Sequence, residues 1–252
     1  MRLILTGATG LVGSAALNHL LTTSLPAGEV SALYILSRSP VPMAEDKPNV
    51  TVIEHKNFNE YPTELLEKLK GVDGCIWAQG ISQTQVSKEE YIKITVDYPL
   101  AAAEAFAGLS DSFNFVYVSG EGATHTPSRL TPFFGRIKGQ TETGLLELAK
   151  KYPSLKPYSV RPAYVDCMND PVVREHVMKR PDQQVFMKKG LHTVFGPIMR
   201  NVLTKSHSPT EFLSKYLVDL ARGDGKPVSG EGVVAGGWVV PNVVFRRSVG
   251  LS

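Results

Sequence analysis

The chain has 252 residues, of which 42% are hydrophobic, so it can bury a substantial core, and its formal net charge is only +3. Its lysines and arginines are scattered rather than gathered into a block that could neutralise a run of phosphates, so nucleic acid is not an expected partner. No run approaches the roughly 18 apolar residues of a membrane span, and the first predicted strand begins at Arg2. We therefore expect a cytoplasmic protein without a signal peptide or an integral membrane segment.

Short apolar runs alternate along the chain with longer stretches of helical period. The runs are rich in Val, Ile, Leu and aromatic residues, which is typical of buried parallel strands. They are Arg2–Leu5, Ala32–Leu36, Val50–Ile53, Gly74–Trp77, Asn114–Val118 and Tyr158–Arg161. This alternation predicts an α/β fold, a doubly wound and mainly parallel Rossmann sheet with helices on both faces. We expect a single domain over residues 1–252.

Apolar residues at helical spacing predict helices after the first, fourth and fifth strands. The three predicted buried faces are Gly13, Ala16, Leu17 and Leu20; Ile94, Tyr98, Ala101, Ala102 and Ala105; and Ile137, Thr141, Leu145 and Leu148. Farther along, Ser208-Pro209-Thr210-Glu211 has the form of a capping box with proline in the first helical position. It predicts a helix from about Pro209 to Arg222, ending before Gly223.

Residues 167–206 have weak periodicity and a basic composition. This segment is either a small lobe that caps the substrate side of the sheet or a solvated irregular surface, and the composition favours neither. Only two cysteines occur, Cys75 and Cys167, without the paired spacing of a zinc site or a disulfide framework, so we expect buried, reduced thiols. The six histidines lack the spacing of a metalloprotease helix, and no metal is expected.

A glycine-rich turn follows the first strand and opens the first predicted helix. Gly7 permits a tight turn, Gly10 lets the backbone approach a pyrophosphate, and Gly13 allows close packing of helix and strand. The unpaired N–H groups at the start of the helix attract the anion. The sequence therefore predicts that a dinucleotide binds the turn Gly7, Ala8, Thr9, Gly10, Leu11, Val12 and Gly13.

The residues at the end of the second strand indicate which dinucleotide binds. An Asp or Glu there would accept hydrogen bonds from the adenosine ribose and repel a 2′-phosphate. Ser37, Arg38 and Ser39 stand at this position instead. A planar guanidinium suits a phosphate, so we predict NADP(H) as the cofactor.

These motifs resemble the atypical short-chain dehydrogenase/reductases, and within them the Tat-interacting-protein-like group of small NADPH-binding oxidoreductases. The resemblance covers Arg2 to about Tyr164 and is carried by TGATGLVG, LSR, AQG, YVSGEGA, RIKGQTE and VRPAYV. It implies that Asn57 and Phe58 flank the adenine. It also implies further contacts along the cofactor and near the nicotinamide, from Ala78, Gln79, Gly80, Arg161 and Pro162.

In this superfamily a serine polarises the substrate carbonyl, a tyrosine exchanges the proton, and a lysine four residues later holds the nicotinamide ribose. The resemblance puts Ser119, Phe134 and Lys138 at these positions, and Thr95 where an asparagine is usual. The spacing of four places Phe134 and Lys138 on one helix face, so Lys138 can reach a ribose beside a ring without a hydroxyl.

The loss of the tyrosine leaves three alternatives, because a positioned acid or base is typically worth about 10² to 10⁴ in rate. In the first, which we favour, the protein reduces a small carbonyl or enone compound with NADPH and another proton donor. Tyr98, Tyr164, Thr131 or a water near Ser119 are the candidates. In the second, the site performs an isomerisation, elimination or conjugate reduction that needs no tyrosine, because substrate or solvent takes the proton. In the third, the protein is an NADPH-binding sensor or scaffold without redox turnover. The oligomeric state is not predicted.

Overall fold

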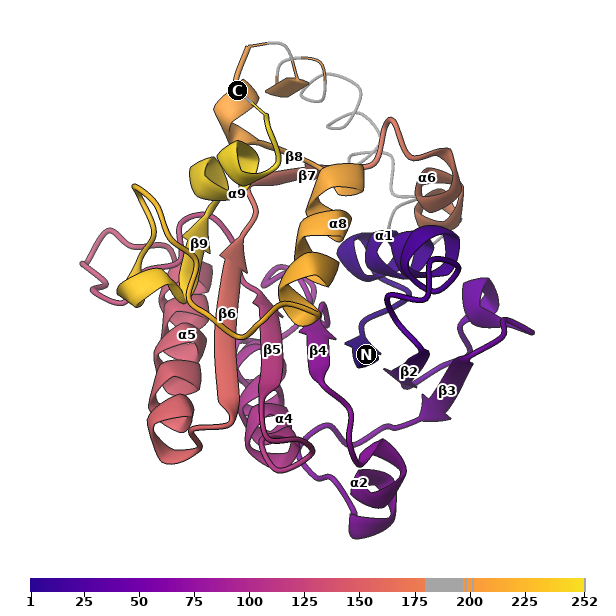
Figure 1. Ribbon diagram of the computed structural model, residues 1–252. Helices are drawn as coiled ribbons and strands as arrows, with labels where there is room; N and C mark the ends of the chain where they lie inside the picture. The colour runs from indigo at the N-terminus through magenta and orange to yellow at the C-terminus, as the bar shows by residue number, and fades with distance from the viewer. Residues whose placement is uncertain (180–196, 198, 201, 252) are drawn as a thin grey trace.

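The computed structural model describes residues 1–179, 197, 199, 200 and 202–251. A sheet of seven parallel strands, ordered β3-β2-β1-β4-β5-β6-β9, forms its centre (Figure 1). The strands are β1 (Arg2–Thr6), β2 (Ala32–Ser37), β3 (Val50–Glu54), β4 (Gly74–Trp77), β5 (Phe113–Val118), β6 (Leu155–Arg161) and β9 (Val239–Pro241). The chain moves outward from β1 to β3 and then returns to the other side of β1. This is the doubly wound order, so the predicted fold class is confirmed.

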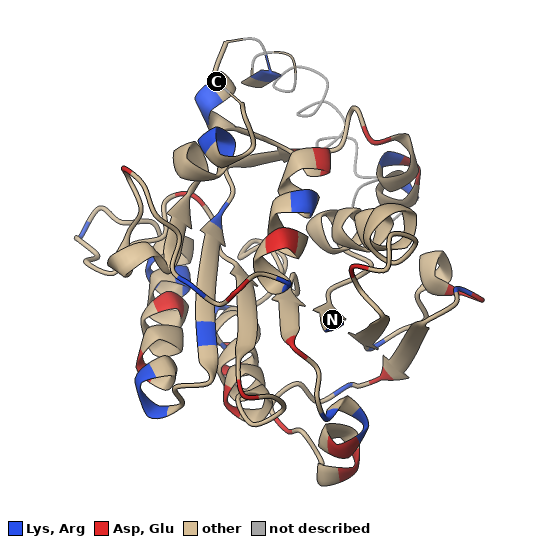
Figure 2. Cartoon of the chain, viewed as in Figure 1, with Lys and Arg blue, Asp and Glu red and all other residues tan. Residues whose placement is uncertain are grey.

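Helices cover both faces of this sheet and bury a separate core on each (Figure 1). Residues of β1 alternate between the two cores, because Leu3 and Leu5 enter one and Ile4 the other. The first core is covered by α1 (Leu11–His19), α8 (Thr210–Ala221) and α9 (Asn242–Ser248). The second is covered by α2 (Thr63–Leu69), α4 (Tyr98–Phe106) and α5 (Phe133–Lys151). Figure 2 shows acidic and basic residues interspersed on the helices.

The predicted buried face of the first helix is confirmed, whereas that of the second is wrong in part. A π-helical turn over Lys93–Asp97 joins α3 (Lys88–Ile92) to α4. Its wider turn shifts the residues that follow, so that regular helical spacing counted from Ile94 no longer identifies the inner face. The buried residues of α4 include Ala102, Ala103 and Phe106, while the predicted Tyr98, Ala101 and Ala105 are only half-buried.

The predicted capping box at Ser208 is not formed. Helix α8 begins at Thr210, and its N-cap residue is Pro209, which makes no side-chain capping hydrogen bond. Ser208 lies instead in strand β8 (His207–Pro209), where its hydroxyl donates to Asn242 Oδ1 at 2.7 Å and accepts the Ala163 N–H at 2.9 Å. The helix still ends before Gly223, as the sequence predicts.

A small lobe stands over the carboxyl ends of the strands (Figure 1). It contains a two-stranded parallel sheet of β7 (Tyr164–Asp166) and β8, and helix α6 (Pro171–Met178), which packs on Ala15 of α1. Much of the predicted cap over 167–206 lies outside the described residues. Cys75 is buried, but Cys167 is only half-buried because it follows β7 at the surface of this lobe. Within the described ranges, further short helical turns lie at Leu20–Ser24, Pro42–Ala44, Thr204–Ser206 and Ala235–Gly237.

No helix among the described residues is long and apolar enough to cross a membrane.

Candidate functional site

A cleft of about 660 Å³ opens at the carboxyl ends of β1, β2, β4 and β5. In a doubly wound sheet this edge is where ligands bind, beside the point at which the strand order reverses. The cleft is lined by most of the predicted site residues: Gly7, Thr9, Gly10, Leu11, Val12, Ser37, Arg38, Phe58, Ala78, Gln79, Gly80, Thr95, Ser119, Phe134, Lys138 and Pro162. Ala8, Gly13 and Asn57 do not line it. Residues that sequence reasoning missed include Ile81, Ser82, Gln85, Tyr117 and Glu121.

The glycine turn forms a tight cradle at the start of α1. Gly7 has a φ of +68°, and its carbonyl accepts the Gly10 N–H at 2.8 Å. A Cβ at Gly7 would lie 2.5 Å from the Ala78 carbonyl oxygen, and one at Gly13 would lie 2.0 Å from the Gly7 carbonyl oxygen. Both glycines are therefore required sterically. Gly13 supports the turn from behind, which explains why it does not line the cleft.

Arg38 lies at one end of the cleft, directly after β2. Its side chain is exposed, whereas the neighbouring Ser37 hydroxyl donates to the Ser39 carbonyl at 2.7 Å. That bond holds the turn over residues 37–39, in which Arg38 is the charged residue. The arrangement offers a fixed positive charge to an anion at this end of the cleft.

Phe134 and Lys138 line the opposite part of the cleft from one face of α5. The Phe134 ring lies against the Gly122 backbone, since a Cβ at Gly122 would be 3.3 Å from Phe134 Cζ. The Lys138 ammonium donates to the carbonyl oxygens of Val118 at 3.2 Å and Ser119 at 2.7 Å. Burial lowers the pKa of Lys138 to about 8, although the charge of Glu142 opposes the shift.

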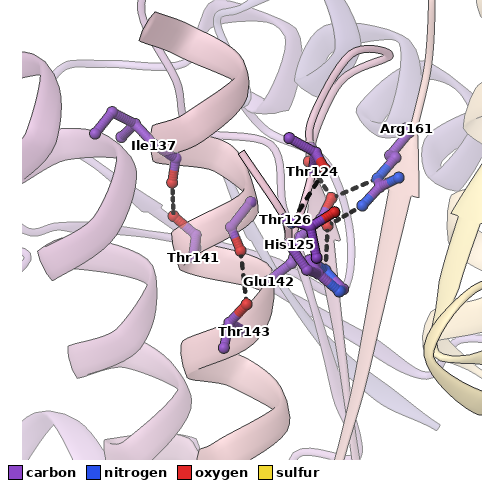
Figure 3. A network of polar contacts seen from close by, with 10 residues as sticks. Thr124, His125, Thr126, Ile137, Thr141, Glu142, Thr143 and Arg161 are labelled. Atoms are coloured by element: carbon purple, nitrogen blue, oxygen red, sulfur yellow. Dashed lines mark hydrogen bonds and ion pairs between the residues drawn. The ribbon is translucent and has the colours of Figure 1, made fainter. Parts of the chain in front are cut away.

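Ser119 donates its hydroxyl proton to Glu142 Oε1 at 2.6 Å, away from any cleft ligand. The Glu142 side chain is fully buried between His125 and Arg161 (Figure 3). His125 Nε2 lies 2.7 Å from Oε2, while Arg161 donates through Nε to Oε1 at 2.9 Å and through its terminal nitrogen to Oε2 at 2.5 Å. These contacts form a polar network around the buried Glu142 carboxylate, behind the wall of the cleft.

The charge state of Glu142 follows from these contacts. Burial by itself would raise the pKa of the carboxyl, but hydrogen bonds from Arg161, His125 and Ser119, together with the Arg161 charge, lower the pKa below its usual value. Glu142 is therefore a carboxylate at neutral pH and holds the Ser119 proton. Arg161, which the resemblance implies near the nicotinamide, instead pairs with this carboxylate and does not line the cleft.

Glu142 was not predicted as a site residue. The sequence contains one signal for it: a glutamate next to Thr141, which belongs to the predicted buried face, and four residues after Lys138. Its partners, however, come from three other segments of the chain, and no helical spacing relates them. Thr141 itself donates to the Thr95 carbonyl at 2.7 Å. This bond connects α5 to the residue that stands where the superfamily usually has an asparagine.

No model of a protein family matches the sequence. The chain is 33% identical to leucinostatins biosynthesis cluster protein T of Purpureocillium lilacinum, over 98% of this chain and 94% of that protein. It is 39% identical to botcinic acid biosynthesis cluster B protein 16 of Botryotinia fuckeliana (strain B05.10), over 61% of this chain and 99% of that protein.

The same fold occurs in solved structures of other proteins. The short-chain dehydrogenase/reductase from Serratia marcescens BCRC 10948 has a TM-score of 0.63 at 12% identity, covering 96% of this chain and 97% of that one. The Bordetella bronchiseptica enzyme WbmF in complex with NAD+ has a TM-score of 0.64 at 14% identity, covering 98% and 77%. These likenesses confirm the Rossmann-type fold. The identity over nearly the whole length of both chains shows that this protein belongs to the family of leucinostatins biosynthesis cluster protein T.

Proposed function

We propose that this protein is an NADPH-dependent oxidoreductase of the short-chain dehydrogenase/reductase type, acting on a small carbonyl or enone compound. The observation that carries the proposal is the cradle at Gly7 and Gly13, where any side chain would collide with backbone. A cradle of this kind, at the start of a helix and beside the reversal of strand order, suits a pyrophosphate. WbmF, which shares the fold, was solved with NAD+.

The remaining cleft residues fit the rest of an NADPH molecule. Arg38 would pair with the adenosine 2′-phosphate, and Phe58 would pack beside the adenine. Gln79 and Gly80, after β4, would follow the cofactor toward Lys138 and Phe134 at the nicotinamide end. When bound, the nicotinamide supplies or accepts a hydride, and the chain orients the substrate beside it.

The kind of substrate follows from the relatives and from the cleft. Both relatives carry names from biosynthesis clusters, for leucinostatins and botcinic acid. We therefore infer that the substrate is a small intermediate of a comparable biosynthetic sequence. Its carbonyl or conjugated double bond would lie between Ser119, Phe134 and Lys138, which line the same part of the cleft.

Cofactor choice tests the proposal directly. A charge-assisted hydrogen bond is worth about 1.5 to 3 kcal/mol, so NADPH should bind about 10 to 150 times more tightly than NADH. Arg38→Ala should remove most of that preference and leave NADH affinity nearly unchanged. Calorimetric titration of both cofactors measures this, with the exposed Arg129→Ala as the matched control. Equal affinities in the natural protein would contradict the assignment of NADPH.

A second candidate function is an NADPH-binding protein without redox turnover, and one observation favours it. Phe134 has no hydroxyl, and the Ser119 proton is directed to Glu142. Phe134→Tyr separates the two functions when NADPH oxidation is followed with aldehydes, ketones and enones. Turnover by the natural form supports the oxidoreductase, whereas turnover by the Tyr form alone supports a binding protein. A product assay that does not depend on NADPH consumption detects a non-redox isomerase or lyase, the third alternative.

A further inference from the structure

Among the residues that the structure describes, the reacting end of the cleft lacks the expected hydroxyl acid. Phe134 carries none, and Ser119 donates its only proton to a carboxylate. Tyr117 also lines the cleft, but burial raises the pKa of its phenol far above the neutral range. The Thr95 hydroxyl is too weak an acid to replace a phenol. A carbonyl reduced here would have to take its proton from another group.

Lys138 has the right number of N–H bonds for that task. Its ammonium carries three, and two of them are donated to the carbonyls of Val118 and Ser119 at the end of β5. One N–H remains for a ligand in the cleft. If that proton is lost, the neutral amine still has two N–H bonds for the same two carbonyls. Both charge states therefore satisfy the same protein contacts, and proton loss requires no rearrangement of the backbone.

The charged and titratable groups around Lys138 allow this change of charge. Glu142 lies one turn later on α5, but Arg161 pairs with its charge. The Tyr117 ring on β5 lies 5.7 Å from the Lys138 ammonium. Glu121, on the loop after β5, lines the same cleft and accepts the Asn242 N–H at 3.2 Å. Burial dominates over these neighbours and lowers the pKa of Lys138 to about 8, close to working pH.

We propose that Lys138 is a catalytic residue that donates the proton in carbonyl reduction, in place of the hydroxyl absent from Phe134. This inference rests on the proposed function. The carbonyl carbon accepts the hydride from the reduced nicotinamide, and the electron pair of the C=O π bond moves to oxygen. That oxygen takes the free N–H proton of Lys138. The products are an alcohol, the oxidised nicotinamide and a neutral amine, which regains a proton from water.

The pH dependence follows from the required charge state. Reduction needs the ammonium, so the rate is constant well below pH 8 and falls about tenfold per pH unit well above it. The reverse oxidation needs the neutral amine and rises with pH over the same range. A lysine that only holds the ribose would weaken cofactor binding in both directions when it loses its proton, so it would not make the oxidation rise with pH.

The inference is tested by measuring the rate of NADPH oxidation between pH 6 and 9.5. The three probes are benzaldehyde, cyclohexanone and cyclohexenone. Lys138→Met and Lys138→Arg should both lower kcat by about 10² to 10⁴ and abolish the break near pH 8. The arginine variant decides between the roles, because its guanidinium can hold a ribose but does not release a proton in this range. NADPH affinity, measured by calorimetry, should change by less than about tenfold in the Arg variant. Lys88→Met is the control, an exposed lysine whose ammonium lies 5.8 Å from the Phe133 ring.

A second measurement needs neither a substrate nor a variant that folds. Competitive acetylation of the natural protein with acetic anhydride in the presence of NADPH, followed by mass spectrometry, reports the protonation of each lysine against pH. Lys138 should titrate near pH 8. Lys151, whose pKa is raised by its hydrogen bonds with Glu104 and Tyr152, should titrate well above it. Titration of both together would overturn the inference, as would an active Lys138→Arg enzyme or bound NADPH without reduction of any probe. Failure of the natural protein to bind NADPH would instead overturn the proposed function.

Discussion

Glu142 determines what its neighbours in the cleft wall can do. Because its carboxylate accepts the Ser119 proton, the serine presents lone pairs to the cleft and can accept a hydrogen bond from a substrate hydroxyl. The same carboxylate fixes Arg161 outside the cleft lining. One buried residue thus changes the roles that the resemblance implies for two others.

Loss of the Glu142 charge should be costly. Removing one partner of a buried ion pair typically lowers the free energy of unfolding by about 3 to 5 kcal/mol, because the other charge stays buried without compensation. Glu142→Gln should therefore destabilise the protein strongly, as measured by urea denaturation. Glu147→Gln, on the same helix, is the control: its pair with Lys150 is exposed and contributes at most about 1 kcal/mol. Similar losses in the two variants would show that the network contributes little.

Among the elements, the turn from β1 to α1 tolerates little change in its residues. A methyl group at Gly13 would have to occupy space 2.0 Å from the Gly7 carbonyl oxygen, which belongs to backbone and cannot rotate away. Gly13→Ala should consequently open the turn, lower the melting temperature and weaken NADPH binding together. Gly108→Ala tests the general effect of the substitution, since a Cβ there meets nothing within 4 Å. Normal NADPH affinity in Gly13→Ala would mean that the turn does not hold the cofactor.

How far the elements could be predicted depends on how many residues carry each signal. The six predicted strands match β1 to β6 because each is a distinct apolar run, although β6 begins three residues earlier, at Leu155. Strands β7, β8 and β9 have three residues each, too few to show a period. The π-helical turn before α4 depends on tertiary packing that the sequence does not reveal.

The same contrast divides the candidate site. The glycine turn, Arg38 and Lys138 belong to local motifs, so the sequence could predict them, and all of them line one cleft. Ser119 and Arg161 both contact Glu142, which lies 23 positions after Ser119 and 19 positions before Arg161. Such contacts are set by the packing of α5 against the sheet, which no local pattern encodes.

At the scale of the whole molecule, Asn242 connects the lobe to the main sheet. It stands directly after β9, and its side chain accepts from Ser208 and donates to the Lys205 carbonyl, both at 2.7 Å. Its backbone N–H also bonds Glu121 at the edge of the cleft. The buried amide of Asn242 is therefore one of the groups that hold β8 in position relative to the cleft.

Asn242→Ala should loosen the lobe while the main sheet stays folded. The variant leaves a buried hydroxyl and a carbonyl without their partner, at a cost of about 1 to 3 kcal/mol. Hydrogen exchange should become faster over 204–209 and unchanged in β1 and β4. Asn59→Ala is the control, since that side chain is exposed. Uniformly faster exchange throughout the protein would indicate that Asn242 stabilises the whole fold rather than the attachment of the lobe.

The all-parallel order of the main sheet also constrains how quickly the protein can form. Parallel neighbours cannot be joined by a hairpin, so every pairing closes a long loop. Leu3 pairs with Gly74, and Ser159 with Val239, 80 positions later. Chains with such distant pairings fold slowly, because the conformational entropy of the closing loop is lost before the stabilising contacts form. During that interval unpaired strand edges are exposed, so refolding yield should fall as protein concentration rises, even where the native state is stable.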